Sequence, residues 1–178
     1  VMHRCTLEEN FDDVIVATCD PEIMKCVENA NGVAVMTAST HDRCTDRVFE
    51  AIEAYPTKLQ NNDLIVMVQG DEVLVNPDML KNMINVYENS KVSIVNLISR
   101  IYREEDHDDV NVVKVVTDVD EQITYLSRAA IPSRSRNSNV PMYQQTGVIA
   151  YSTGSLNEFS RLKQTPLEIA ESIDMLRL

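Results

Sequence analysis

The stretch that most constrains the fold is residues 64–72, LIVMVQGDE, in which an apolar run leads directly into polar residues. A short apolar run rich in Val and Ile predicts a buried strand. In open α/β sheets the ligand lies beyond the carboxyl ends of the strands, where an acidic side chain can hold a hard cation such as Mg²⁺. Asp71 therefore has two interpretations: a metal ligand at such a crevice, or, with Glu72, the start of a solvated loop.

Before this strand, the chain alternates between strand and helix patterns. Residues 14–17 and 33–36 are short apolar runs that predict strands. Between them, Asp20 followed by Pro21 suits the cap and first position of a helix. Thr45 is expected to cap a second helix that leads up to the strand at 64–68. This alternation indicates an α/β fold.

Beyond Glu72, strands become more frequent. Asn76 and Pro77 repeat the cap-then-proline signal, ahead of a helix with an apolar stripe at helical spacing. Further strand patterns cover residues 92–98, 112–116, 123–126 and 146–151. The segment 117–122 separates two of these strands by a distance that suggests a hairpin.

Asp118 and Asp120 form a DxD pattern inside that predicted turn. In other proteins such a pair binds a metal–nucleotide complex or takes part in phosphoryl transfer. Asp also favours turns, because its side chain hydrogen-bonds to nearby backbone amides. We predict a turn, and a phosphoryl-transfer enzyme that uses this pair is the weaker alternative.

Thr165, Pro166 and Glu168 form a capping box ahead of a helix that is expected to run to the final residue. The opening letters, VMHRC, resemble the end of a helix, so both ends of the chain are expected to be cut. The chain contains no internal repeat and no Pro/Gly linker. We therefore expect a single domain over residues 1–178.

Composition limits the possible partners. The net charge of −12 argues against non-specific binding to nucleic acid or to an anionic membrane, because both require many Lys and Arg. No apolar run approaches the length of about 20 residues that a membrane span needs. The four cysteines form no CxxC pair and no zinc spacing with the histidines, so we expect reduced thiols that serve in packing.

Several segments carry a family resemblance. They are VIVATCD at 14–20, MTASTHDRCTDRVFEA at 36–51, VQGDEVLVNPDML at 68–80, NVVKVV at 111–116, YLSRAAIP at 125–132, QTGVIAYS at 145–152 and TPLEIAESIDMLRL at 165–178. In this order they resemble the cytidylyltransferases that activate sugar acids, most closely the 3-deoxy-manno-octulosonate (Kdo) cytidylyltransferases.

The resemblance implies CTP-dependent transfer of CMP to the anomeric hydroxyl of a sugar acid, with release of pyrophosphate and Mg²⁺ as the cofactor. It implies a three-layer α/β/α nucleotidyltransferase fold, Rossmann-like, with a mixed, mostly parallel sheet and a β-rich dimerisation insertion. A cytoplasmic homodimer that serves lipopolysaccharide or surface-glycan synthesis is also expected.

The same resemblance assigns residues. Asp71 would be the catalytic metal ligand, and Gln69 would face the sugar acid. Arg128 would pair with the substrate carboxylate, a role that suits the fork of its guanidinium. Gln145 and Glu168 would complete the acceptor site. The nucleotide-binding block would consist of His41, Thr45, Asp46 and Arg47.

The chain also departs from the family pattern. Gln145 and Ile149 stand where the family commonly has a histidine and a tyrosine, and Ile169 stands where it has a glutamine. These changes remove hydrogen-bonding partners for sugar hydroxyls, so an altered acceptor is expected, such as a modified Kdo or another sugar acid. The family's N-terminal phosphate loop and C-terminal second aspartate are also missing, which leaves a non-catalytic binding or assembly module as the alternative.

Overall fold

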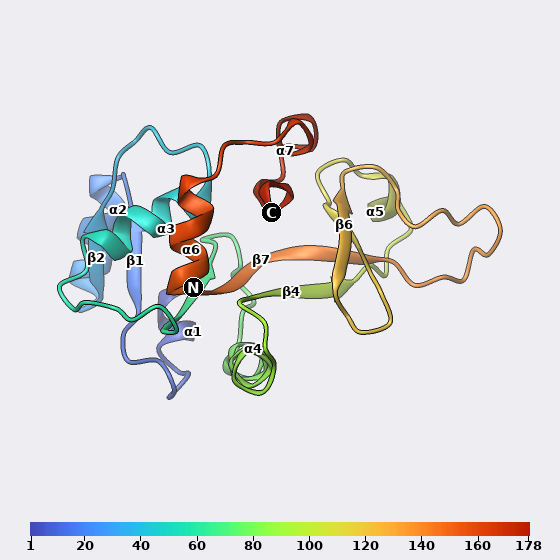
Figure 1. The fold of residues 1–178 in the computed structure, drawn as a ribbon. Helices are drawn as coiled ribbons and strands as arrows, with labels where there is room; N and C mark the ends of the chain where they lie inside the picture. Colours follow the sequence, from blue (N-terminus) through green and yellow to red (C-terminus); the bar gives the residue numbers. More distant parts are fainter. The chain divides into compact units, whose positions relative to one another are not determined.

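The computed structural model describes residues 1–178 and divides them into two compact units (Figure 1). Unit 1 comprises Val1–Val95 and Gly147–Arg161, and unit 2 comprises Asn96–Thr146 and Leu162–Leu178. Strands β4 (Ile94–Arg100) and β7 (Tyr143–Ser152) pair with each other, and each contributes residues to both units. The organisation of the chain as one domain stays a prediction.

Unit 1 holds most of the helices. Its complete elements are α1 (Met2–Cys5), β1 (Ile15–Thr18), α2 (Pro21–Asn29), β2 (Val33–Met36), α3 (Cys44–Glu53), β3 (Leu64–Val68), α4 (Pro77–Asn89) and α6 (Thr153–Arg161). β1 and β2 pair in parallel, joined by α2, as a βαβ crossover requires. β3 pairs with β7 in the antiparallel direction, and α3 contacts α6 (Figure 1).

The core of unit 1 forms where β3 and β7 meet the helices. Buried apolar side chains come from β3, β7, α4 and α6, and they include Met67, Ala150, Leu80, Met83 and Phe159. Figure 1 shows α4 as the green helix that follows β3 in the chain. The apolar stripe that the sequence predicts on α4 is therefore core, although Met79 at its start is 38% exposed.

Unit 2 is built on a hairpin. β5 (Lys114–Thr117) pairs with β6 (Ile123–Ser127), and β5 also pairs with the first residues of β7, both in the antiparallel direction. The other elements are α5 (Glu105–Asp108), α7 (Pro166–Glu171) and the 3₁₀-helix η1 (Asp174–Arg177). Val115, Leu126 and Ile173 form the buried cluster that joins η1 to the hairpin.

Two helix starts and one turn lie where the local sequence signals predict them. The Asp20 carboxylate accepts hydrogen bonds from the backbone amides of Glu22 and Ile23, and the Asn76 side chain accepts one from Met79. The Asp118 carboxylate accepts hydrogen bonds from the amides of Asp120 and Gln122, at 2.9 Å each. The predicted α/β class and the predicted turn at the DxD pattern are therefore confirmed.

The balance of the sheets differs from the prediction. The sheets are mixed, as expected, but antiparallel pairing dominates: β3 with β7, β5 with β6 and β5 with β7. For β5 and β6 the physical reason is the length of the connection between them. The five residues between β5 and β6 permit only a hairpin, whereas parallel neighbours need a crossover of a dozen or more residues.

Two predicted helix boundaries are wrong. Thr45 is not a cap, because α3 begins at Cys44 and Arg43 occupies the N-cap position. The helix predicted from Thr165 to the last residue breaks at Ser172, whose φ of 54° is left-handed and ends α7. The chain then turns so that Ile173 packs against Val115 and Leu126, a tertiary contact that outweighs continuation of the helix.

Two expectations from composition can be compared with the structure. The structure contains no helix with the length and apolarity that a membrane span requires. All four cysteines are free thiols, but only Cys5 is buried, whereas Cys19, Cys26 and Cys44 are exposed. The prediction that they serve in packing therefore holds for Cys5 alone.

Candidate functional site

The turn after β3 presents Asp71 to solvent. The Gln69 amide donates to the Gly147 carbonyl at 2.9 Å, which extends the β3–β7 ladder by one residue. The Glu72 amide then donates to the Gln69 carbonyl at 3.1 Å and closes a tight turn around Gly70 and Asp71. Asp71 lies exposed at the tip of that turn. As the sequence predicts, β3 is therefore followed by an exposed carboxylate.

Glu72 and Gly147 fasten this turn to β7. Glu72 Oε1 accepts a hydrogen bond from the Gly147 amide at 2.5 Å. A Cβ atom on Gly147 would lie 2.8 Å from Cβ, Cδ and Oε1 of Gln69, closer than real Cβ contacts allow. Gly147 thus lets the Gln69 side chain lie against β7. This role of Glu72 was not predicted, because two adjacent carboxylates after a strand carry no signal of which one turns inward.

Asp71 suits a metal that is held largely by its substrate. The structure gathers no group of three or more His, Cys, Asp or Glu residues that could hold an ion by themselves. Mg²⁺ commonly uses one or two carboxylates and completes its shell with waters and substrate phosphates. Because Asp71 is exposed at its turn and Glu72 is bound to Gly147, Asp71 is the carboxylate of this turn that fits such a site.

The segment before α3 is held by side chains of α3 itself. Arg47 Nη1 donates to Thr37 Oγ1 at 2.5 Å and to the Ala38 carbonyl at 3.2 Å. Glu50 accepts hydrogen bonds from the Ala38 amide and from His41 Nε2. The hydrogen bond from His41, and then the one from the Ala38 amide, hold the pKa of Glu50 below its ordinary value. The structure thus brings His41 and Arg47 to one loop and adds Glu50, which the sequence did not single out.

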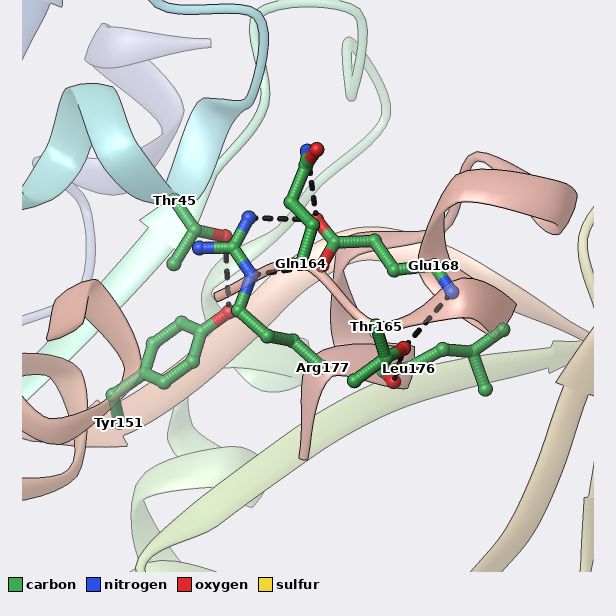
Figure 2. Close-up of polar contacts among 7 residues, drawn as sticks. All are labelled: Thr45, Tyr151, Gln164, Thr165, Glu168, Leu176 and Arg177. Carbon is green, nitrogen blue, oxygen red and sulfur yellow. Dashed lines mark hydrogen bonds and ion pairs between the residues drawn. The ribbon is translucent and has the colours of Figure 1, made fainter. Parts of the chain in front are cut away.

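Thr45 and Asp46 lie in the first turn of α3. Thr45 is fully buried, and its hydroxyl lies 3.3 Å from the Tyr151 hydroxyl in unit 1 (Figure 2). Asp46 is half-buried, and its negative charge suits the positive end of the helix dipole. All four predicted nucleotide-binding residues therefore belong to one short segment, but Thr45 faces the core.

In unit 2, Arg128 binds main-chain carbonyls. Its Nε donates to Glu171 O at 2.6 Å, Nη1 to Val110 O at 2.9 Å and Nη2 to Ser172 O at 3.2 Å. A guanidinium has five N–H donors, so one remains on each terminal nitrogen. Arg128 is only half-buried, so these two donors can face a ligand.

Gln145 lies at the end of unit 2, next to Asn96. Its Nε2 donates to Asn96 Oδ1 at 2.5 Å, and its backbone amide donates to Val113 O at 2.9 Å. The Asn96 amide in turn donates to the carbonyls of Leu97 and Thr146. Gln145 therefore has a fixed orientation and an amide oxygen that can still accept a hydrogen bond.

Glu168 is a buried ion pair partner (Figure 2). Its side chain is 0% exposed, and its carboxylate accepts from Arg177 Nε at 2.9 Å and from Arg177 Nη2 at 2.6 Å. Thr165 caps the same helix by accepting a hydrogen bond from the Glu168 amide at 3.1 Å. These contacts give Glu168 a structural role inside unit 2.

The whole chain, residues 1–178, matches the family model described as cytidylyltransferase. The chain belongs to the cytidylyltransferase family. Its cytidylyltransferase relatives include 3-deoxy-manno-octulosonate cytidylyltransferase of Fusobacterium nucleatum, 34% identical over 99% of this chain and 71% of the relative. The enzyme of the same description from Thermodesulfovibrio yellowstonii is also 34% identical, over 99% of this chain and 73% of the relative.

A second group of cytidylyltransferases is equally similar. The 8-amino-3,8-dideoxy-manno-octulosonate cytidylyltransferase of Shewanella pealeana is 34% identical over 99% of this chain and 72% of the relative. Among solved structures, CMP:2-keto-3-deoxy-manno-octonic acid synthetase complexed with CTP matches 99% of this chain and 71% of its own, with a TM-score of 0.88 and 27% identity. The α/β fold of a CTP-dependent nucleotidyltransferase is therefore established for this cytidylyltransferase.

Proposed function

We propose that this protein transfers CMP from CTP to the anomeric hydroxyl of an eight-carbon sugar acid, Kdo or its 8-amino analogue, and releases pyrophosphate. The observation that carries the proposal is the match over 99% of the chain to a synthetase solved with CTP. Relatives that use the two acceptors are equally similar, at 34% identity. The acceptor is therefore best described as a 3-deoxy-octulosonate whose eighth carbon bears a hydroxyl or an amine.

CTP binds at the loop before α3, which Arg47 and Glu50 hold in place. His41, Asp46 and Arg47 are the residues that meet CTP. A chain with a net charge of −12 needs local positive charge to bind a triphosphate, and Arg47 supplies it together with the positive end of the α3 helix dipole. Thr45 supports the start of α3 from inside unit 1.

On the acceptor side, Arg128 meets the substrate carboxylate. The two N–H groups left on its terminal nitrogens form a fork that matches the two oxygens of a carboxylate. Gln69 and Gln145 supply amide groups for sugar hydroxyls. Glu168 supports α7 through Arg177 instead of contacting the sugar.

The proposal assigns a divalent metal, Mg²⁺, to Asp71. When bound, Mg²⁺ would neutralise phosphate charge and favour the ionised form of the attacking hydroxyl. The chain itself contributes by positioning. Glu72 and Gly147 fix the conformation of the turn, so the Asp71 carboxylate is already in place when the metal and substrate bind.

The remaining expectations form part of the same proposal. The three-layer arrangement, the β-rich dimerisation insertion and the homodimer fit a synthetase of this family. A product of this kind serves lipopolysaccharide or other surface-glycan synthesis, and the need for CTP implies a cytoplasmic reaction.

A pyrophosphate-release assay tests the proposal. The full-length protein is mixed with CTP, Mg²⁺ and, separately, Kdo, 8-amino-Kdo and sialic acid as an unrelated sugar acid. We expect turnover with at least one octulosonate and none without an acid. Absence of turnover with every acid, together with absence of CTP binding in calorimetry, would favour the non-catalytic binding module.

Asp71→Ala is the matched test of the metal ligand. We expect loss of activity by at least about 100-fold without a change in the unfolding midpoint, because Asp71 is exposed and supports no core contact. The control is Asp118→Ala in the hairpin turn, which should keep full activity. Retained activity in Asp71→Ala would exclude the metal role.

A further inference from the structure

Glu171, the last residue of α7, gathers hydrogen-bond donors from the end of β6. Its Oε2 accepts from the Arg128 amide at 2.9 Å, and its Oε1 accepts from Ser127 Oγ at 2.7 Å and from the Tyr125 hydroxyl at 3.3 Å. Ser127 Oγ also accepts from the Ala129 amide at 3.0 Å, so its proton is directed to Glu171. The carboxylate thus fixes the backbone on which Arg128 stands.

The main chain around Glu171 then holds the Arg128 side chain. Glu171 O accepts from Nε at 2.6 Å, and Ser172 O accepts from Nη2 at 3.2 Å. The left-handed conformation of Ser172, with φ 54°, ends α7 and leaves helix-terminal carbonyls for a cation. One residue therefore binds both the backbone and the side chain of Arg128.

A second anchor holds the same guanidinium. Nη1 of Arg128 donates to Val110 O at 2.9 Å. The turn that carries Val110 is held by Lys114, which is 0% exposed and whose Nζ donates to Asp109 O and Val112 O at 2.7 Å each. The guanidinium is therefore held at three of its five donors.

We propose that Glu171 is a positioning residue for sugar-acid binding, which sets the orientation of Arg128 so that its two remaining N–H groups meet the substrate carboxylate. This inference rests on the proposed function, because it takes Arg128 as the carboxylate ligand. A guanidinium that is already oriented loses less conformational freedom on binding, so the effect falls on substrate affinity.

The chemistry requires an ionised carboxylate at position 171. The groups that face it are all donors: the Arg128 amide, the Ser127 hydroxyl and the Tyr125 hydroxyl. A glutamine would keep one acceptor oxygen and place an amide NH₂ against a donor. The hydrogen bond from the Arg128 amide, followed by the one from Ser127, holds the pKa of Glu171 below its ordinary value, so the group is charged at neutral pH.

Steady-state kinetics test the inference with Glu171→Gln. We expect the KM for the sugar acid to rise at least about tenfold, as for the loss of one charge-assisted hydrogen bond, while kcat and the KM for CTP stay within about twofold. Glu158→Gln, an exposed glutamate on α6, is the matched control and should change nothing. An equal rise of both KM values, or a loss of kcat alone, would show a merely structural role and overturn the inference.

A double-mutant cycle shows whether Glu171 acts through Arg128. In an Arg128→Ala background, Glu171→Gln should change the KM for the sugar acid by less than about twofold, because residues that act as a unit are not additive. A full additional effect would overturn the inference.

An NMR measurement separates this inference from the proposed function. The Nε–H resonance of Arg128 should shift and lose its protection from exchange in Glu171→Gln, and an unchanged resonance would overturn the positioning role. If the resonance responds but Arg128→Ala leaves the KM for the sugar acid unchanged, the positioning contact stands and the assignment of Arg128 to the substrate carboxylate is wrong. Glu171→Asp, which keeps the charge, serves as the rescue variant if Glu171→Gln fails to fold.

Discussion

At the scale of single residues, Gly147 makes the clearest prediction. Gly147→Ala places a Cβ atom 2.8 Å from three atoms of Gln69, so either β7 or the Gln69 side chain must move. We expect a loss of about 1–3 kcal/mol in the free energy of unfolding, typical of overpacking, together with a higher KM for the sugar acid. Urea unfolding and steady-state kinetics measure the two effects.

Gly70→Ala is the matched control for this change. A Cβ atom on Gly70 would have nothing within 4 Å, and neither glycine has a positive φ. The control should therefore be neutral or stabilise the fold by no more than about 1 kcal/mol. Equal effects of the two substitutions would mean that contact with Gln69 is not the cause.

Breaking the ion pair between Glu168 and Arg177 should lower the stability of the protein strongly and leave binding of the sugar acid unchanged. Arg177→Met removes the guanidinium that pairs with the buried Glu168 carboxylate, so it should cost about 3–5 kcal/mol in thermal unfolding experiments. Arg103→Met, which removes an exposed ion pair with Glu105, should have a far smaller effect, because solvent screens exposed ion pairs. The double change Glu168→Leu with Arg177→Met should regain most of the loss, and failure to do so would argue against an ion-pair origin.

Glu171 predicts how stability depends on pH. Its pKa in the folded protein is lowered, chiefly by the hydrogen bond from the Arg128 amide, so its contribution is fully present above the ordinary glutamate pKa of about 4.3. The contribution is lost as the pH falls through the lowered folded value. Urea midpoints of the wild type and Glu171→Gln should therefore differ at pH 7 and converge towards pH 3. A difference that is constant with pH would contradict this linkage.

At the scale of secondary-structure elements, the cap of α4 can be tested. The Asn76 side chain accepts a hydrogen bond from the Met79 amide at 3.1 Å, and the helix carries the buried residues Leu80 and Met83. Asn76→Ala should cost about 1 kcal/mol in chemical unfolding. Asn82→Ala, at an exposed position inside the same helix, should be neutral or slightly stabilising. No loss in Asn76→Ala would mean that packing alone fixes the start of α4.

The elements that sequence predicts well are those with local signals. Asp20–Pro21 and Asn76–Pro77 mark helix starts because the cap and the proline act within one turn. The start of α3 was misplaced because Thr45 is an ordinary capping residue whose position in the core is set by Tyr151, which is 106 positions away. Helix α6 was not predicted. Ser152, which caps it by accepting a hydrogen bond from the Ser155 amide at 3.0 Å, is also the last residue of β7, and the helix contacts α3.

At the scale of the whole molecule, the candidate site could be predicted only in part. Asp71 followed from a local pattern, a buried strand that ends in a carboxylate. The contact of Glu72 with Gly147 spans 75 positions, and the contact of Arg128 with Glu171 spans 43. Both are set by strand register and by the end of α7, which no local pattern encodes. The resemblance to known enzymes predicts which residues meet the substrates, and the structure shows what holds those residues in place.

The most direct test of the account is identification of the product. The full-length protein is incubated with CTP, Mg²⁺ and equal amounts of Kdo and 8-amino-Kdo, and the mixture is analysed by mass spectrometry. The account predicts a CMP conjugate of at least one of these acids, formed in equal amount to pyrophosphate and absent when ATP replaces CTP. Absence of any CMP–octulosonate conjugate, with folded protein and intact substrates, would contradict it.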